Sequence, residues 1–243
     1  MKTIIIDFHG YKGPSLTGAG SLDLSVQKLL NNLYPPKDIE TYLNLERDFG
    51  IEVFCNRLSQ TLKNMGVTVE HYQLPCNRGI IDPNRINDGY QSAVRDIIPA
   101  SETGLIKALS NQAAVLKENL FSWLQDFPKD TMVIIPHSMA QNDPSPFKSS
   151  IYQDLKGYNQ SWITPSNSVR KNALINATDE GGTMGNINLY KALENSFTDL
   201  KLPFAWNEIY LNNPNYTDYK VMDSFKNSVF FELRKDFLAT NTR

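Results

Sequence analysis

The sequence contains only two cysteines, Cys55 and Cys76, among its 243 residues. They lack the close spacing of a zinc ribbon or a redox motif, and they neither require nor exclude a disulfide. No stretch approaches the ~20 apolar residues of a membrane-spanning helix. The apolar run in the opening segment MKTIIIDFHG is too short for a secretory signal and ends in charge rather than in small residues. We therefore expect a cytoplasmic protein without a membrane partner.

The chain also lacks an excess of charge of either sign. Its 24 basic and 26 acidic residues give a net charge of -2, and the isoelectric point is about 5.9. Such a chain has no broad basic surface for a nucleic-acid backbone, so we expect no nucleic-acid partner. A small anion, by contrast, needs only a local basic patch. Hydrophobic residues make up 41% of the chain, which is enough to form the core of a single domain over residues 1–243.

Short β-branched runs alternate along the chain with longer segments of helical periodicity. The spacing predicts strands at 3–8, 67–74, 131–138, 170–178, 204–211 and 227–234, and helices at 21–33, 51–66, 103–127 and 187–197. This alternation predicts an α/β fold in which helices cover a sheet. Residues 139–169 have no clear periodicity, and we predict a long loop there at the rim of the sheet.

Histidine is scarce, and two of the three histidines directly follow predicted buried strands, in IIIDFHG and VIIPHSM. Ligands of open α/β sheets collect at the carboxyl ends of strands, so His9 and His137 are candidates to meet across one rim and bind a metal. The alternative is that both are strand-end histidines satisfied by hydrogen bonds. His71 lies inside an alternating strand, and we expect it to be structural or exposed.

A hydrolytic zinc site needs a third protein ligand and keeps a position for water, whose pKa falls to ~7. Two carboxylates are candidates. Asp7 lies two residues before His9 on the same side of a strand, and Asp23 lies near the start of the next helix. The residue three positions after His9 is Lys12, so a glutamate ligand at that spacing is absent. Asp23 has an alternative explanation as a helix-start carboxylate favoured by the dipole.

Glu232 is the candidate general base that later protonates the leaving nitrogen of an amide. It follows the apolar run of Val229, Phe230 and Phe231 in a predicted strand. An apolar setting raises the pKa of a carboxyl group toward neutral pH, which suits a group that transfers protons. The alternative is a strand-end glutamate paired with the neighbouring Arg234 or Lys235.

The segment NRGIIDPNR, residues 77–85, contains two arginines in a stretch whose composition restricts the backbone. Pro83 restricts the backbone, and Asp82 and Asn84 favour turns, so we predict a rigid hairpin-like loop rather than a helix. An arginine held there can bind a carboxylate through two parallel hydrogen bonds, which lysine cannot do. The alternative is a surface loop in which Asp82 forms a salt bridge with an arginine.

Taken in chain order, these motifs resemble the N-formylglutamate amidohydrolase family, zinc hydrolases whose fold is similar to that of zinc carboxypeptidases. Family members carry an Arg, three residues and then Asp-x-Asn-Arg. Arg78, Asp82, Asn84 and Arg85 match that register.

Four further motifs fall in the family's order along nearly the whole chain. They are FHGYKGP with His9, DLSVQKL with Asp23, PHSM with His137 and FFELRKDF with Glu232. The chain departs from the family pattern at Phe8, where members commonly have proline, and at Ile135, where they have aspartate. It also lacks the family's Lys-Gly-Gly-Tyr segment.

The resemblance implies a three-layer α/β fold with a mixed central sheet and helices on both faces. It also implies a role for each matched residue: His9, Asp23 and His137 as zinc ligands, Glu232 as the catalytic carboxylate, and Arg78, Asn84 and Arg85 as the clamp for a substrate carboxylate. We therefore predict a zinc-dependent amidohydrolase that acts on an N-acyl amino acid or a small acidic amide.

Two other functions fit parts of the same pattern. The segment IIIDFHGYKG also resembles the first strand of peptidoglycan N-acetylmuramoyl amidases, which are zinc enzymes. A binding protein on the same fold would keep the carboxylate clamp without a working metal. Metal content and turnover would separate these functions.

Overall fold

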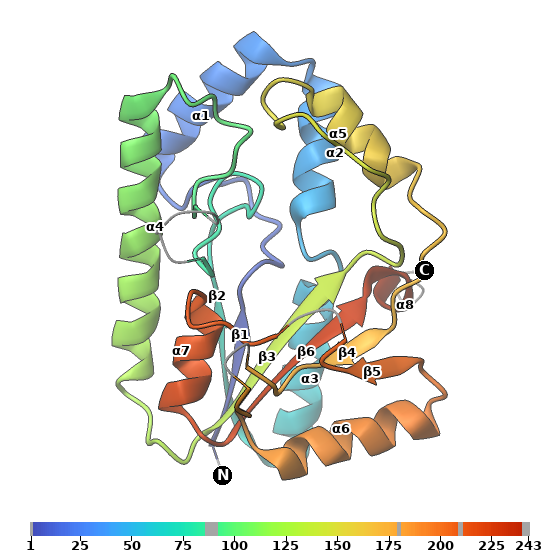
Figure 1. Ribbon diagram of the computed structural model, residues 1–243. Coiled ribbons are helices and arrows are strands. Elements are labelled where there is room, and N and C mark those ends of the chain that lie inside the picture. The colour runs from blue at the N-terminus through green and yellow to red at the C-terminus, as the bar shows by residue number, and fades with distance from the viewer. Residues whose placement is uncertain (1, 86–91, 179–180, 209–210, 240–243) are drawn as a thin grey trace.

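The computed structural model describes residues 2–85, 92–178, 181–208 and 211–239. Within these residues the chain forms a six-stranded sheet in the order β2-β1-β3-β6-β4-β5 (Figure 1). The strands are β1 (Lys2–Asp7), β2 (Thr68–Gln73), β3 (Met132–Met139), β4 (Asn172–Leu174), β5 (Phe204–Trp206) and β6 (Ser228–Arg234).

The sheet is mixed, as predicted. Strands β2, β1, β3 and β6 run parallel to one another, β4 pairs antiparallel with β6, and β5 is parallel to β4. The carboxyl ends of β1, β3 and β6 consequently open on the same edge of the sheet. Side chains that follow or end these three strands are brought together there.

Helices cover both faces of the sheet. They are α1 (Gly20–Leu33), α2 (Pro36–Glu46), α3 (Ile51–Asn64), α4 (Thr103–Leu124), α5 (Leu155–Ile163), α6 (Ile187–Asp199), α7 (Thr217–Ser224) and α8 (Lys235–Ala239). On one face Phe54 of α3 contacts Phe231, and on the other Trp123 of α4 contacts Tyr72. This arrangement confirms the three-layer α/β prediction.

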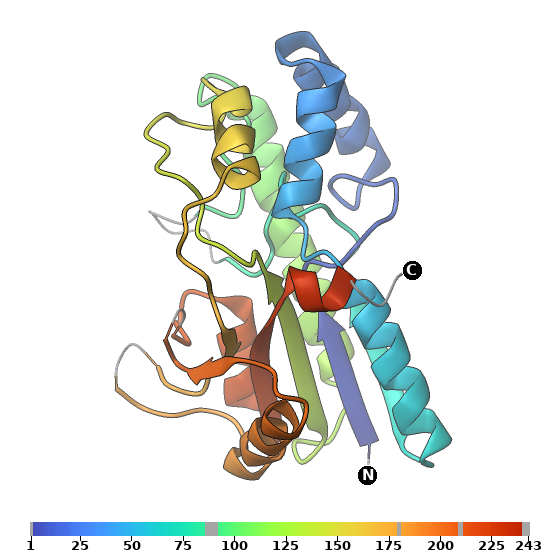
Figure 2. The ribbon, with the colours of Figure 1, turned by 90° about the vertical axis from the view of Figure 1, so that its right-hand side faces the viewer.

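Helices α1, α2 and α5 extend past the carboxyl edge of the sheet, as two perpendicular views show (Figures 1 and 2). Helices α2 and α5 pack against each other, and the amide of Asn159 in α5 donates to the carbonyl of Asp38 in α2 at 2.8 Å. These helices therefore form a wall above the strand ends.

The predicted strands and helices all occur, with shifted ends. The largest differences are at 170–178 and 204–211, where the strands are only Asn172–Leu174 and Phe204–Trp206, and residues 209–210 lie outside the described residues. Strand β1 was recognisable in the sequence because Ile4, Ile5 and Ile6 are all fully buried between two helical layers.

The prediction of a long loop over residues 139–169 was wrong in part, because α5 lies within it. The inward positions of α5 include the polar residues Asn159 and Ser161, so it has no continuous apolar stripe. Helix α2 and the short helices α7 and α8 were not predicted either. In the described part of the chain, no helix is both long and apolar enough to cross a bilayer.

Tyr190 of α6 contacts both strands of the antiparallel pair, at the end of β4 and within β6. Its hydroxyl is fully buried, donates to the carbonyl of Ile175 at 2.6 Å and accepts from the Phe230 amide at 3.0 Å. The tyrosine thus holds α6 to β6, two residues before Glu232.

Tyr190→Phe should lower the free energy of unfolding by about 1–3 kcal/mol, because it leaves the buried Phe230 amide without a partner. Urea denaturation measures this change. Tyr72→Phe, on the half-buried edge strand β2, is the matched control and should change stability by less than about 0.5 kcal/mol. Equal losses in the two variants would contradict the role given to the Tyr190 hydroxyl.

Candidate active site

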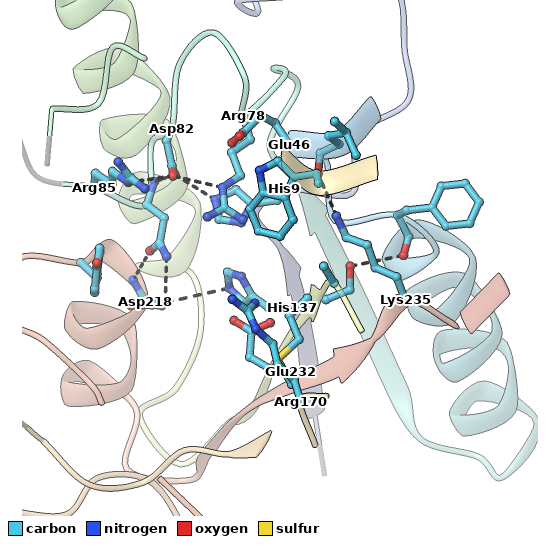
Figure 3. Close-up of a pocket in the computed structure, with 18 of the residues that line it drawn as sticks. His9, Glu46, Arg78, Asp82, Arg85, His137, Arg170, Asp218, Glu232 and Lys235 are labelled. Carbon is cyan, nitrogen blue, oxygen red and sulfur yellow. Dashed lines mark hydrogen bonds and ion pairs between the residues drawn. The ribbon is translucent and has the colours of Figure 1, made fainter. Parts of the chain in front are cut away.

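Three of the candidate residues from the sequence meet at the carboxyl edge of the sheet (Figure 3). His9 follows β1 by two residues, whereas His137 lies in β3 and Glu232 in β6. His137 and Glu232 are register partners on neighbouring strands, so their side chains project from the same face. The ring centroids of His9 and His137 are 4.8 Å apart, and all three residues are buried.

Asp48, in the junction between α2 and α3, completes this cluster. Its Oδ2 lies 3.4 Å from Nδ1 of His9 and 3.3 Å from Nδ1 of His137. The Ser138 amide donates to the same oxygen at 3.1 Å, and Arg78 donates to Oδ1 at 3.1 Å. Burial alone would raise the pKa of Asp48, but the two histidines and Arg78 outweigh it and hold that pKa well below its ordinary value.

The structure places Asp23 outside this cluster, which corrects the expected ligand set. The Asp23 carboxylate accepts hydrogen bonds from the amides of Leu16 and Thr17 and from the hydroxyls of Ser15 and Thr17, at 2.6–3.0 Å. It therefore orders the loop before α1, close to the helix-start alternative. Asp7 is not the third member either, because its Oδ1 accepts from the amides of His9 and Gly10.

Asp48 carried no signal in the sequence that pointed to a ligand. It lies in ERDFG, between two helices, where neither a strand end nor a periodic pattern marks it. Its position depends on the backbone at Gly50, which has a φ of 86° and begins α3. Its own amide donates to the carbonyl of His9 at 3.2 Å, which ties the junction to the end of β1.

Asp82 orients His9 from the other side of the ring. Nε2 of His9 lies 2.8 Å from Oδ1 of Asp82, and both groups are buried. A carboxylate accepts only, so the proton of a neutral His9 is on Nε2, and the lone pair of Nδ1 points into the cluster. Although burial raises the pKa of Asp82, His9 and two arginines bring it well below the ordinary value.

The segment that ends at Asp82 pairs with residues 93–95, as in a hairpin. Ile81 and Val94 form an antiparallel bridge, the Asp82 amide donates to the carbonyl of Ala93 at 2.7 Å, and the Arg95 amide donates to the carbonyl of Ile80 at 3.0 Å. This pairing fixes the direction of the Asp82 carboxylate toward His9.

Arg78 and Arg85 both contact Asp82. Their Nε atoms lie 3.4 Å and 3.2 Å from its Oδ2, so the salt bridges of the simpler alternative are present. Each arginine side chain nevertheless remains partly exposed, at 29% and 22%, and lines the cavity beside the cluster. The two guanidinium groups therefore fix Asp82 and still face the space where a ligand would lie.

Asn84 is bonded mainly to Asp218 of α7. Its amide nitrogen donates to Oδ2 of Asp218 at 2.8 Å, and its amide oxygen accepts from the backbone of Asp218 at 2.9 Å. The same Asp218 oxygen lies 3.9 Å from Nε2 of His137. Burial raises the pKa of Asp218 despite these neighbours. This carboxyl was not among the residues expected from the sequence.

Glu232 is a buried carboxyl without an obvious partner. Its Oε2 has no hydrogen bond within the described part of the chain. Arg234 pairs with Asp236 instead, and Lys235 donates to the carbonyls of Leu45 and Arg47, so neither forms the ion pair of the simpler alternative. Burial is the main reason that the pKa of Glu232 is raised to about 7.

The cluster opens into a cavity of about 650 Å³ that is rich in cationic side chains. These are Arg78, Arg85, Arg95, Arg170 and Lys235. A cavity of this volume accommodates a small molecule rather than a polymer chain in extended contact. The carboxyl groups of Glu46, Asp82, Asp218, Glu232 and Asp236 line it as well.

The donor set fits a zinc ion. Zinc ligands at about 2.0–2.1 Å in a tetrahedron lie roughly 3.3 Å from one another, which is close to both distances from Asp48 to the histidines. Nδ1 of His9 is buried, and among the described residues it has no hydrogen-bond partner. The surrounding carboxylates raise the pKa of His137 to about 9 although burial lowers it, so this position favours a positive charge.

No protein-family model matches the sequence, and no curated protein matches it. The fold is similar to the crystal structure of N-formylglutamate amidohydrolase from Ralstonia eutropha JMP134, with a TM-score of 0.54 and 16% sequence identity. The similarity covers 97% of this chain and 83% of that one. Gene product Atu2144 from Agrobacterium tumefaciens has a TM-score of 0.44 and 14% identity, over 98% and 81% of the two chains.

At this low sequence identity, the structural similarity shows the fold alone. The chemistry has to be inferred from the residues of the site. The resemblance read from the order of the motifs is confirmed at that level. The chain has the fold of an N-formylglutamate amidohydrolase.

Proposed function

We propose that the protein is a zinc-dependent amidohydrolase that cleaves a small N-acylated amino acid or a similar acidic amide. The observation that carries the proposal is the cluster of His9, Asp48 and His137 beside the buried carboxyl of Glu232, whose Oε2 has no hydrogen bond within the described residues. The fold shared with an N-formylglutamate amidohydrolase and the arginines that line the cavity support it.

In this proposal His9, Asp48 and His137 hold the metal. Zinc bound there would polarise the amide carbonyl and lower the pKa of a water molecule. Asp82 keeps the His9 proton on Nε2, so that Nδ1 is available as a ligand atom. The bond from Arg78 keeps Asp48 ionised and in place.

Glu232 is proposed to move the proton. A carboxyl with a pKa near 7 is ionised in a substantial fraction at neutral pH, yet it also gives a proton back readily. It would take a proton from the attacking water and deliver it to the leaving amide nitrogen. Its position beside His137 on the neighbouring strand supports this role, because the carboxyl would lie next to the proposed metal ligands in both steps.

Arg85 is proposed to bind the carboxylate of the substrate, with the remaining amide N–H of Asn84. Burial lowers the pKa of Arg85, and so do the positive charges of Arg95 and Arg78. An anion bound next to such a guanidinium group stabilises its charged form. Arg78 would act indirectly, since it contacts both Asp48 and Asp82.

The zinc-loaded protein should hydrolyse N-formyl or N-acetyl amino acids, and Glu232→Gln should lower kcat by about 10²–10⁴-fold while zinc content stays the same. The amide keeps the size of the side chain but cannot accept the proton. Glu208→Gln is the matched control, because Glu208 is exposed and pairs with the exposed Lys171. A panel of N-acyl amino acids, with zinc measured by elemental analysis, tests this prediction.

Turnover of N-acetylmuramoyl peptides in place of N-acyl amino acids would favour the peptidoglycan amidase function instead. Zinc binding without turnover of either class would indicate a binding protein. Full activity of Glu232→Gln would contradict the proton-transfer role.

Arg85→Lys and Arg85→Met should raise KM for acidic substrates by about 10–100-fold with a smaller effect on kcat, because each removes a charged two-point contact. The control is chemical: the carboxamide analogue of the same substrate lacks the carboxylate, so the variants and the unaltered protein should turn it over at similar kcat/KM. An equal loss on both substrates would contradict the clamp.

Asp82→Asn should weaken zinc binding by about 10–100-fold, because the amide no longer holds the Nε2 proton of His9 as a carboxylate does. Competition with a chromophoric chelator measures the affinity, and circular dichroism checks that the variant is folded. Asp223→Asn, an exposed site paired with Lys226, is the control. Unchanged zinc affinity in folded Asp82→Asn would exclude the orienting role of Asp82.

A further inference from the structure

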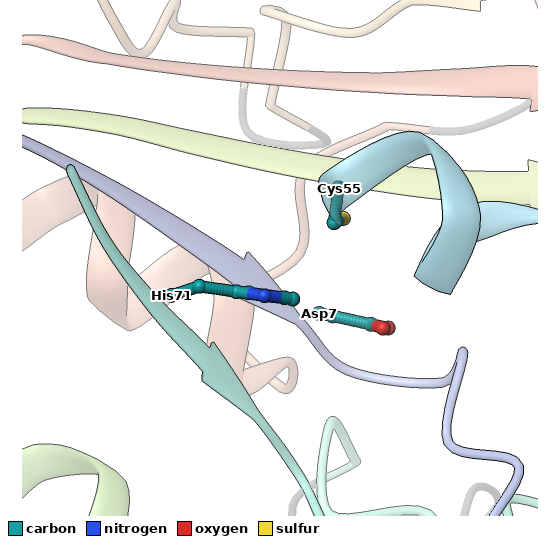
Figure 4. Close-up of side chains that lie close together, drawn as sticks. All are labelled: Asp7, Cys55 and His71. Atoms are coloured by element: carbon teal, nitrogen blue, oxygen red, sulfur yellow. The ribbon is translucent and has the colours of Figure 1, made fainter. Parts of the chain in front are cut away.

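A second group of metal-binding side chains lies on the face of the sheet that α3 covers (Figure 4). Asp7 ends β1, His71 lies in β2 and Cys55 lies in α3. The register pairs His71 with Ile5, which shares a face of β1 with Asp7. One potential ligand atom from each of the three residues lies within 4.8 Å of the others.

We propose that Asp7, Cys55 and His71 form a second metal site, which takes Zn²⁺ or a similar borderline-soft divalent cation. No part of the proposed hydrolytic chemistry uses these residues. The site is therefore structural in this proposal, and it stands independently of the proposed function.

The burial of the group is the first argument. Asp7 and Cys55 are fully buried between the sheet and α3. Apolar side chains would pack there without the free-energy cost of removing polar groups from water. Nε2 of His71 is buried too, and in the described part of the chain it has no hydrogen-bond partner. A cation between the three side chains would provide the interaction that this nitrogen lacks.

The chemistry of the donors is the second argument. A thiolate, a carboxylate and a neutral imidazole together carry two negative charges, which a divalent cation balances in a site with little water. Sulfur and nitrogen donors suit zinc, whereas Mg²⁺ and Ca²⁺ prefer oxygen ligands alone.

The carboxylate of Asp7 is already fixed in direction. Gln73 donates to its Oδ2 at 2.8 Å, and the amides of His9 and Gly10 donate to its Oδ1 at 3.1 Å and 2.6 Å. A Cβ at Gly10 would lie 2.4 Å from Oδ2, so only glycine allows this approach. Asp7 thus joins the second cluster to the backbone of the loop that carries His9.

The same three residue types could also form a Cys-His-Asp nucleophile. The positions do not suit that role, because Cys55 is fully buried and the cavity of the candidate active site is lined by none of the three. A substrate would have to displace α3, whereas an ion needs only a narrow path. His71 is half-buried on the outer strand β2 and offers that path.

Cobalt provides the direct test, because the cluster of His9, Asp48 and His137 contains no sulfur. Reconstitution of the whole protein with Co²⁺ should produce the near-ultraviolet charge-transfer band of a thiolate ligand. The band should persist in Cys76→Ala, the matched control, since Cys76 is equally buried but not part of the group. It should disappear in Cys55→Ala. The absence of a band in the unaltered protein would overturn the proposal.

Zinc content provides the second measurement. Cys55→Ala should contain one ion fewer per chain than Cys76→Ala, whether or not the cluster at His9 also binds zinc. A failure of the proposed function would change both counts equally and leave this difference intact. His71→Gln, at a half-buried position, should fold even if Cys55→Ala does not, and it should lose the same ion. Equal zinc content in His71→Gln and Cys76→Ala would refute the site.

Discussion

The buried carboxylate of Asp48 is the interaction on which the candidate active site depends. It receives the Ser138 amide from β3 and the guanidinium of Arg78 from the hairpin-like loop, and it contacts both histidines. A buried charge is tolerated only when its partners offset the loss of hydration, and removal of any one of them leaves that loss uncompensated. The junction of α2 and α3, the loop after β1 and strand β3 are therefore held together through one side chain.

Four of the buried carboxyl groups at the candidate active site divide into two kinds. The pKa values of Asp48 and Asp82 lie well below the ordinary range, because neighbouring histidines and arginines outweigh the effect of burial. Those of Asp218 and Glu232 are raised, and burial is the largest cause in both. Environments that separate the pKa values of carboxyl groups in this way suit them to different roles, because an ionised carboxylate attracts a cation whereas a carboxyl group with a raised pKa holds its proton more readily.

How much of the site could be anticipated depended on where each residue lies. His9, His137 and Glu232 follow or end strands whose apolar runs are easy to recognise, and parallel strands bring their carboxyl ends to one edge. Asp48 has no such marker, because it lies between two helices. Asp23 was chosen by its position in a motif order, but its carboxylate orders the loop before α1.

The helices and strands also differ in how far the sequence predicts them. Strands β1, β3 and β6 are fully buried on both faces and therefore read as continuous apolar runs. Helix α5 was not predicted, because its buried face includes the polar Asn159, whose amide nitrogen donates to a carbonyl of α2. Local sequence patterns indicate which side of a helix or strand is apolar. They do not indicate which buried polar side chains form hydrogen bonds with another element.

The sequence by itself determined the α/β architecture and the strand ends that meet at one edge, because these follow from periodicity over a few neighbouring residues. Only the tertiary structure decided which carboxylate joins the histidines, that Asp82 holds His9, and that Asn84 binds Asp218. Those contacts link residues far apart in the chain, and a buried polar group selects its partner only when packing has removed water as the alternative.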